Sequence, residues 1–227
     1  MVSRLIVALD FPTLDEAERV AKELVDHVAG FKVGMELLMG EGPRAIGKIS
    51  GLGQPVFADA KLHDIPNTVE RAATRISEAG ARWVTVHAAG GSEMMQAAIS
   101  GMGDAGVLAV TMLTSLEASD LPAIGISATA EDHVLAMTRL AAAASVEGVV
   151  CSPAEISAVK RADAGLKVFT PGVRPEESAT DDQKRVATPE TAVRDGADYL
   201  VIGRPITRAD DPAQSARKIA ATIASLR

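Results

Sequence analysis

The sequence predicts an α/β protein that forms a single (β/α)8 barrel domain over residues 1–227. Three observations predict this fold class: eight short apolar runs of strand length, segments with helical spacing between them, and an aromatic content of only 3%. With so few aromatic residues the core must consist of Val, Ile, Leu, Met and Ala. Such a core suits buried parallel strands under Ala-rich helices.

The predicted strands are the apolar runs, each rich in β-branched residues. In the first half of the chain they span residues 4–10, 30–35, 54–61 and 82–88. In the second half they span residues 107–113, 147–152, 166–172 and 198–203. Eight strands that alternate with helices in one chain favour a closed barrel.

Eight helices are predicted between these runs, and several carry terminal signals. Residues 13–28 begin with a capping box formed by Thr13 and Glu16 and continue with an apolar stripe. Other helices are predicted by a glycine at the end or a proline near the start of residues 67–80, 153–163 and 211–226.

A doubly wound open sheet is the competing topology, but it commonly has fewer strands, and no GxGxxG sequence opens the first βα turn. No linker, repeat or low-complexity stretch divides the chain. The least regular segment, residues 173–188, is polar and long for a βα connection. Loops of this length are often functional lids, and we predict one here.

Composition excludes several functional classes. The net charge is −7 with both signs interspersed, so we expect no nucleic-acid partner. The only cysteine, Cys151, lies in an apolar run and is expected to be a buried small residue, as in a cytoplasmic protein without disulfides. We expect neither a signal peptide nor a membrane span. No spacing typical of a zinc site is present, so no metal is predicted.

Charged residues follow the predicted strands where a barrel enzyme builds its active site. Asp10 ends the first strand, Lys32 lies on the second, and Asp59 and Lys61 end the third, with Asp64 just beyond. Asp59 and Lys61 are two positions apart on a strand and therefore point to the same side. Burying both under the outer helices would be costly, so we place them at the interior mouth.

Asp59 and Lys61 alone could be a structural ion pair that closes the barrel. With Asp10 and Lys32 beside them, four alternating charges form a network whose members keep each other ionised. A protonated lysine is a poor Schiff-base nucleophile but a good cation and proton donor. We therefore predict a catalytic array.

A phosphate site is predicted at the loops after the seventh and eighth strands, where barrels often bind this group. These loops read TPGVRP and VIGRPIT. Gly172 and Gly203 let backbone N–H groups approach an anion, while Arg174 and Arg204 follow within two residues.

These segments together resemble the orotidine 5′-monophosphate decarboxylases, in particular the bacterial members, along essentially the whole chain. The matching segments are IVALD (6–10), FKVGMEL (31–37), FADAKLHDIPNTV (57–69), VTMLTS (110–115), TPGVRP (170–175), DDQKRVATP (181–189) and YLVIGRPIT (199–207). The resemblance implies a homodimer of barrels that converts orotidine monophosphate to uridine monophosphate without a metal or organic cofactor.

The resemblance also implies a role for each site residue. Asp10 and Lys32 would bind the ribose hydroxyls, and Asp59 and Lys61 would face the scissile carboxylate. The other implied contacts are Asp64 and Thr68 in the neighbouring subunit's site, Thr114 on the pyrimidine, and Arg174, Gln183, Gly203 and Arg204 at the phosphate.

Two alternatives remain open. Mg²⁺-dependent phosphosugar lyases and decarboxylases of the same superfamily share a DxKxxD pattern, but they need an acid at the end of the second strand, where this chain has Lys32. A non-catalytic nucleotide-binding barrel would need no charged array at residues 59–64.

Overall fold

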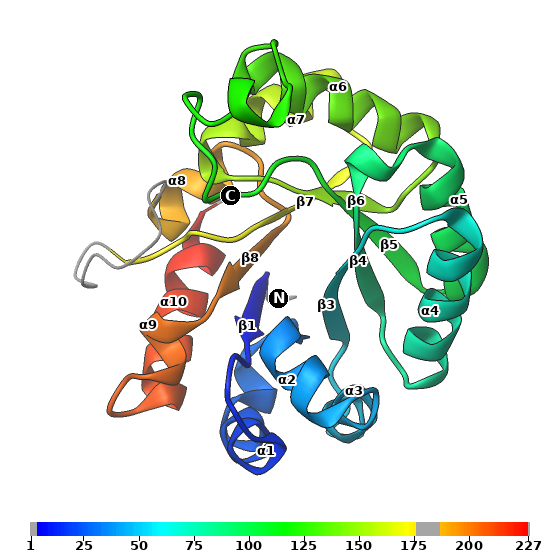
Figure 1. Cartoon of the computed structure of the whole chain (residues 1–227). Coiled ribbons are helices and arrows are strands. Elements are labelled where there is room, and N and C mark those ends of the chain that lie inside the picture. The colour runs from blue at the N-terminus through cyan, green and yellow to red at the C-terminus, as the bar shows by residue number, and fades with distance from the viewer. Residues whose placement is uncertain (1–3, 176–186, 227) are drawn as a thin grey trace.

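Eight parallel strands close into a barrel in chain order, as predicted (Figure 1). The computed structural model describes residues 4–175 and 187–226. The strands are β1 (Leu5–Ala8), β2 (Gly30–Val33), β3 (Val56–Leu62), β4 (Trp83–His87), β5 (Gly106–Val110), β6 (Gly148–Val150), β7 (Lys167–Thr170) and β8 (Tyr199–Ile202). Since β8 pairs back with β1, the sheet has no free edge.

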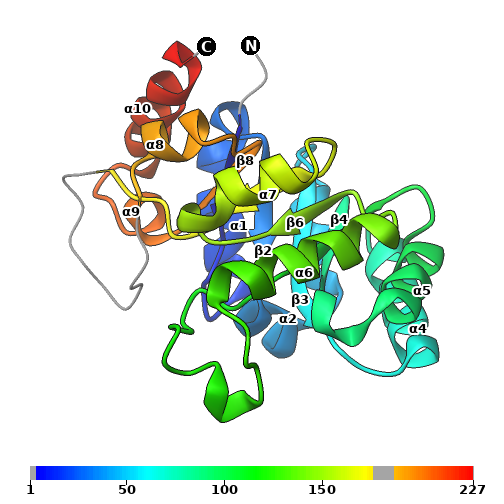
Figure 2. The same cartoon turned by 90° about the horizontal axis from the view of Figure 1, so that it is seen from above.

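Helices cover the outside of the barrel (Figure 2). The α-helices are α1 (Leu14–Leu24), α2 (Met35–Glu41), α3 (Arg44–Ser50), α4 (Pro66–Glu78), α5 (Ser92–Met102), α6 (Ala130–Ala143), α7 (Ile156–Ala162), α8 (Pro189–Arg194), α9 (Arg204–Thr207) and α10 (Pro212–Ser225). The short 3-10 turns are η1 (Val25–His27), η2 (Ala88–Gly90), η3 (Pro122–Ile124) and η4 (Pro153–Glu155).

The prediction of one helix after each strand is wrong in detail. The described residues contain ten α-helices, because β2 is followed by both α2 and α3, and β8 by both α9 and α10. Pro43 separates α2 from α3, since proline supplies no N–H to continue the first helix. Residues 13–28 and 153–163 also divide, each into an α-helix and a 3-10 turn.

The predicted helix starts are largely confirmed, because the capping chemistry is local. The Thr13 hydroxyl accepts a hydrogen bond from the Glu16 N–H at 3.4 Å, and α1 begins at the next residue. At α10, the Asp211 carboxylate accepts from the Gln214 N–H at 2.8 Å, directly before Pro212. Every strand is shorter than the apolar run that predicted it.

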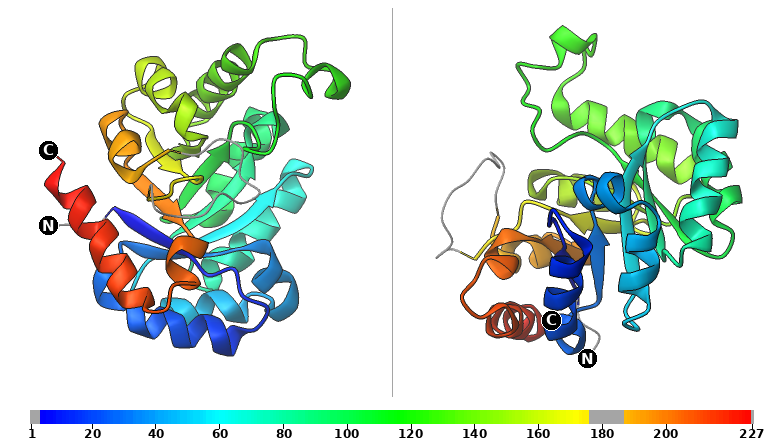
Figure 3. Two further views of the ribbon diagram at one scale, coloured as in Figure 1. Left: turned by 90° about the vertical axis from the view of Figure 1, so that its left-hand side faces the viewer. Right: turned by 60° about the horizontal axis from the view of Figure 1, so that its bottom comes forward.

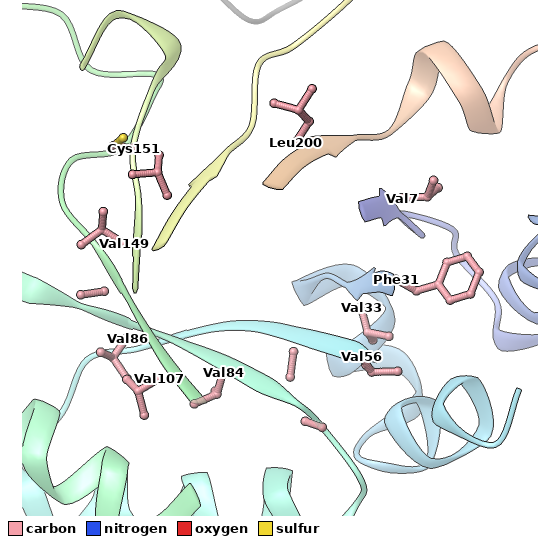
Figure 4. Close-up of a cluster of buried hydrophobic side chains, with 14 of the residues drawn as sticks. Val7, Phe31, Val33, Val56, Val84, Val86, Val107, Val149, Cys151 and Leu200 are labelled. Carbon is pink, nitrogen blue, oxygen red and sulfur yellow. The ribbon is translucent and has the colours of Figure 1, made fainter. Parts of the chain in front are cut away.

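The larger core lies between the strands and the helices. In Figure 4 it is seen as a cluster of mainly Val side chains on the outer face of the strands, with Phe31, Cys151 and Leu200. Cys151 is fully buried, and burial raises the pKa of its thiol, so it remains a protonated packing residue as expected.

A second, smaller core fills the N-terminal end of the barrel interior. Phe169 stacks on Tyr199 at 4.6 Å between ring centroids and meets Trp83 edge-on at 5.3 Å. Trp83 and Tyr199 are the first residues of their strands, so this aromatic cluster closes the end opposite the predicted site. The C-terminal end of the interior is left for polar groups.

The connection from β5 to α6, residues 111–129, projects beyond the barrel and carries η3 (Figure 3). Its first residues remain at the barrel mouth and contribute to the pocket described below. Among the described residues, no helix is both long enough and apolar enough to cross a membrane.

Candidate active site

A pocket with a volume of about 270 Å³ opens at the C-terminal ends of the strands. Six charged side chains line it: Asp10, Lys32, Asp59, Lys61, Arg174 and Arg204. Thr114, Gly172 and Gly203 also line it. The structure therefore brings together in one cavity most of the residues that the sequence predicted for the site.

Four of these six charged side chains form one continuous chain of contacts. Lys32 Nζ donates to Asp10 Oδ1 at 2.9 Å and lies 3.4 Å from Asp59 Oδ2. Lys61 Nζ donates to both carboxylate oxygens of Asp59, each at 2.8 Å. The order is thus Asp10, Lys32, Asp59, Lys61, with the signs alternating as predicted.

The two central members of this chain are held ionised by their neighbours. Burial alone would raise the pKa of Asp59, but the charges of Lys32 and Lys61, together with hydrogen bonds, lower it below its ordinary value. Burial alone would lower the pKa of Lys32, but Asp59 and Asp10 raise it instead. Asp59 is therefore a buried carboxylate that remains negative at neutral pH.

The path of β3 between Asp59 and Lys61 is not that of a regular strand. From Ala58 to Leu62 it advances four residues while β4 advances two, from Val84 to Val86. Lys61 has a positive φ of 47°, a conformation that non-glycine residues rarely adopt. The predicted proximity of the pair is confirmed, but the reason given for it, simple alternation along a strand, is wrong.

Two residues that sequence reasoning missed support this geometry. Thr85 on β4 hydrogen-bonds both the Asp59 side chain and the Lys61 backbone. Gly34, directly after β2, leaves room for the pair of Asp10 and Lys32, since an added Cβ would overlap Asp10 Oδ1 and lie 2.8 Å from Lys32 Nζ. A glycine next to a charged strand end is a signal that could have identified Gly34. No comparable signal marks Thr85.

The predicted phosphate end of the pocket is built by the loops after β7 and β8. Gly172 has a φ of 75°, which glycine adopts at little cost. The backbone on the two sides of the predicted lid is joined there, because the Arg174 N–H donates to the Ala187 carbonyl at 2.9 Å and the Ala187 N–H donates to Gly172 at 3.2 Å. Gln183 lies outside the described residues.

Asp64 and Thr68 do not line this pocket. Both are exposed, in the β3–α4 connection and the first turn of α4, respectively. The Asp64 carboxylate accepts a hydrogen bond from the Ile65 N–H at 2.7 Å. Their expected place in a neighbouring subunit's site stays a prediction.

The donor set of the mouth does not suit a divalent cation. Within the described residues, no group of three or more His, Cys, Asp or Glu side chains could hold a metal ion. The space between Asp10 and Asp59 is taken by the Lys32 ammonium, which contacts both carboxylates. A metal ion there would meet a positive charge, so the Mg²⁺-dependent alternative is not favoured.

Comparisons with known proteins agree with this geometry. The profile of the "Orotidine 5'-phosphate decarboxylase / HUMPS family" matches residues 3–219. Orotidine 5'-phosphate decarboxylase of Anaeromyxobacter sp. (strain K) is 52% identical over 220 residues, covering 96% of this chain and 97% of that one. The protein of the same name from Sphingopyxis alaskensis is 43% identical over 224 residues, covering 98% and 100%.

A solved structure shows the same arrangement of the chain. The crystal structure of orotidine 5'-phosphate decarboxylase from Lactobacillus acidophilus superposes with a TM-score of 0.87 at 33% sequence identity, covering 97% of this chain and 99% of that one. Fold and sequence thus point to one family over nearly the whole length.

Proposed function

The chain belongs to the orotidine 5'-phosphate decarboxylase / HUMPS family, and on this premise we propose that it converts orotidine 5′-monophosphate to uridine 5′-monophosphate and CO2. This reaction is the last step of de novo pyrimidine nucleotide synthesis, and we place it in the cytoplasm. The observation that carries the proposal is the alternating chain of Asp10, Lys32, Asp59 and Lys61 in the pocket. The same pocket holds two Gly–Arg loops suited to a phosphate.

The proposed chemistry is electrostatic. When the bond from C6 to the carboxylate carbon breaks, the electron pair remains on C6 in the plane of the ring, where the π system cannot accept it. The Asp59 carboxylate next to the substrate carboxylate raises the energy of the bound substrate. Two such charges about 4 Å apart repel each other by about 4 kcal/mol at an effective dielectric constant of 20.

Lys61 supplies the opposite charge and the proton. Its ammonium stabilises the carbanion as CO2 leaves and then forms the new C6–H bond, after which the amine regains a proton from water. Because the ammonium already lies 2.8 Å from Asp59, little reorganisation is needed during the reaction. Preorganised charges of this kind are usually the largest single contribution to catalysis.

The remaining pocket residues would orient the nucleotide. We assign Asp10 and Lys32 to the ribose hydroxyls and Thr114 to the pyrimidine. The phosphate is assigned to Arg174, Gln183, Gly203 and Arg204. Binding energy at the phosphate could then close residues 173–188 over the site and exclude water.

We further propose that the active enzyme is a homodimer in which Asp64 and Thr68 complete the partner's site. The support is their position, since both side chains are exposed and outside the pocket of their own barrel. Ile65, which lies between them in the sequence, is also 67% exposed.

The decisive assay follows the ultraviolet absorbance of orotidine monophosphate after the protein is added. We expect turnover that EDTA does not change, and Lys61→Ala should reduce it by at least about 10²-fold, since general acid catalysis contributes about 10²–10⁴-fold. Binding of the nucleotide should be partly retained in this variant. Normal turnover by Lys61→Ala would contradict the mechanism, and strict Mg²⁺ dependence would contradict the assignment.

A further inference from the structure

Thr85 is a fully buried residue in the middle of β4, and its hydroxyl contacts both members of the predicted catalytic pair. The hydroxyl donates to Asp59 Oδ1 at 3.0 Å. It also accepts a hydrogen bond from the Lys61 N–H at 2.9 Å. One side chain on the neighbouring strand therefore joins the carboxylate of the first residue to the backbone of the second.

The orientation of Thr85 follows from its neighbours on β4. Val84 and Val86 point into the outer core between strands and helices (Figure 4). Because side chains alternate along a strand, Thr85 between them faces the interior of the barrel. It does not line the pocket, so it lies behind Asp59 rather than at the cavity surface.

The backbone contact matters because β3 is irregular at this point. The register between β3 and β4 shifts between Ala58 and Leu62, and Lys61 adopts a positive φ of 47°. Such a conformation is unfavourable for lysine and persists only when its surroundings enforce it. The Thr85 hydroxyl gives the Lys61 N–H a buried partner in this bent segment. The bend, in turn, brings the Lys61 ammonium to the Asp59 carboxylate.

The side-chain contact selects the orientation of Asp59. Its two oxygens accept from Lys61, and Oδ2 also lies near Lys32. Both lysines are long and flexible, whereas threonine has a stiff χ1 and sits on a barrel strand. Thr85 is thus the rigid donor among the three groups that contact this carboxylate.

We propose that Thr85 is a positioning residue for decarboxylation, whose hydroxyl holds the Asp59 carboxylate and the Lys61 backbone in one fixed relation. The proposal rests on the proposed function, since it concerns the groups that would stress the substrate carboxylate and deliver the proton. Thr85 acts through these groups and does not touch the nucleotide. Its loss should therefore impair the chemical step more than binding.

The test compares Thr85→Val, which has nearly the same shape but no hydroxyl, with Thr85→Ser, which keeps the hydroxyl. We expect Thr85→Val to lower kcat by about 10–100-fold with KM changed less than about threefold, because small misplacements of reacting groups can cost about 10²-fold. Thr85→Ser should recover most of the lost kcat. If valine prevents folding, Thr85→Ala takes its place as the variant without the hydroxyl.

Thr138→Val is the matched control. Thr138 is also fully buried, but it lies on α6 and its hydroxyl donates only to the Val134 carbonyl of its own helix, at 2.8 Å. This variant should keep normal kcat despite losing a buried hydroxyl. A similar loss of kcat in Thr138→Val, or normal kcat in Thr85→Val, would overturn the proposal.

A second measurement does not depend on turnover. The carboxyl carbon of Asp59 can be followed by NMR in the free protein as pH is lowered, in wild type and in Thr85→Val. Removing the Thr85 donor should raise the pKa of Asp59, since this hydrogen bond favours the charged form. An unchanged titration would contradict the proposal even if decarboxylation is confirmed. A shifted titration would support the contact even if the protein acts on a different substrate.

Discussion

Asp59 shows how a single buried carboxylate can stay charged at the mouth of a barrel. Only 9% of its surface is exposed, and burial by itself raises the pKa of this carboxyl. Lys32 and Lys61 contact it from two sides and reverse that shift. A catalytic role for Asp59 therefore depends on Lys32 and Lys61 being in place. The position of Lys32 depends in turn on the space that Gly34 leaves beside it.

At this scale we predict that Gly34→Ala will weaken substrate binding. The added methyl group would overlap Asp10 Oδ1 and crowd Lys32 Nζ, so the pair must separate. If these two residues bind the ribose, KM should rise about tenfold, equivalent to one hydrogen bond to a charged group of about 1.5 kcal/mol. Steady-state kinetics would measure the change.

Gly40→Ala is the control for this substitution. Gly40 lies in α2, and an added Cβ would meet nothing within 4 Å. The variant should keep wild-type KM and gain up to about 1 kcal/mol of stability, because alanine is the better helix former. An equal rise of KM in both variants would show that the Asp10–Lys32 contact is not the cause.

At the scale of elements, the two ends of the strands carry different kinds of charge cluster. At the N-terminal ends, Glu147 before β6 accepts hydrogen bonds from Arg82 at 2.8 and 2.9 Å, from Trp83 at 3.0 Å and from Lys167 at 2.9 Å. This cluster ties β4, β6 and β7 together far from the pocket. In barrel enzymes the active site lies at the opposite end of the strands, so this cluster contributes to stability rather than to catalysis.

We predict that Glu147→Gln will lower the free energy of unfolding by about 1–3 kcal/mol, the usual cost of losing hydrogen bonds to a charged group. For a chain of this size each kcal/mol corresponds to about 2–4 °C in Tm. Activity at a temperature where the variant is folded should be normal. Thermal denaturation, followed by circular dichroism, measures the change.

The same variant should alter the pH dependence of stability. Burial would raise the pKa of Glu147, but hydrogen bonds from Trp83, Lys167 and Arg82 lower it below its ordinary value of 4.5. The stabilisation is therefore present above pH 4.5 and is lost as pH falls through the lowered pKa. Glu147→Gln should remove this part of the acid sensitivity. Glu78→Gln, at an exposed pair with Arg75, is the control and should leave the free energy of unfolding nearly unchanged.

At the scale of the whole molecule, the two ends of the barrel interior hold different kinds of side chain. Aromatic side chains fill the N-terminal end, while the charged array and the pocket occupy the C-terminal end. The single barrel supplies most of the predicted site, but Asp64 and Thr68 are exposed and do not line its pocket. If they serve catalysis, a second subunit must bring them to the pocket.

If each active site is built from residues of both subunits, activity should be recovered when two inactive variants are mixed. In a dimer of one Lys61→Ala and one Asp64→Ala subunit, the barrel that keeps Lys61 receives an intact Asp64 from its partner. Random exchange makes half of the dimers mixed, with one of two sites intact, so about one quarter of wild-type activity should return. Subunits would be mixed, exchanged under mild denaturant and assayed. Activity no higher than that of the separate variants would indicate that each barrel uses its own Asp64.

The sequence by itself determined the strand order, most helix starts and the identity of the charged residues at the mouth. These features depend on local or periodic signals, such as the Thr13 cap of α1 and the apolar runs. Parallel strands in a closed barrel must also place their C-terminal ends together, so the meeting of Asp10, Lys32 and Asp59 followed from the fold class.

Only the tertiary structure decided the details that hold Asp59 and Lys61 in place. The bend of β3 at Lys61 and the buried Thr85 hydroxyl depend on the fit between two strands, which no spacing along one strand reveals. The close approach of Gly34, after β2, to Asp10, after β1, likewise joins the ends of two different strands. Periodicity shows which side of a strand a residue faces, but contacts across strands fix where its atoms lie.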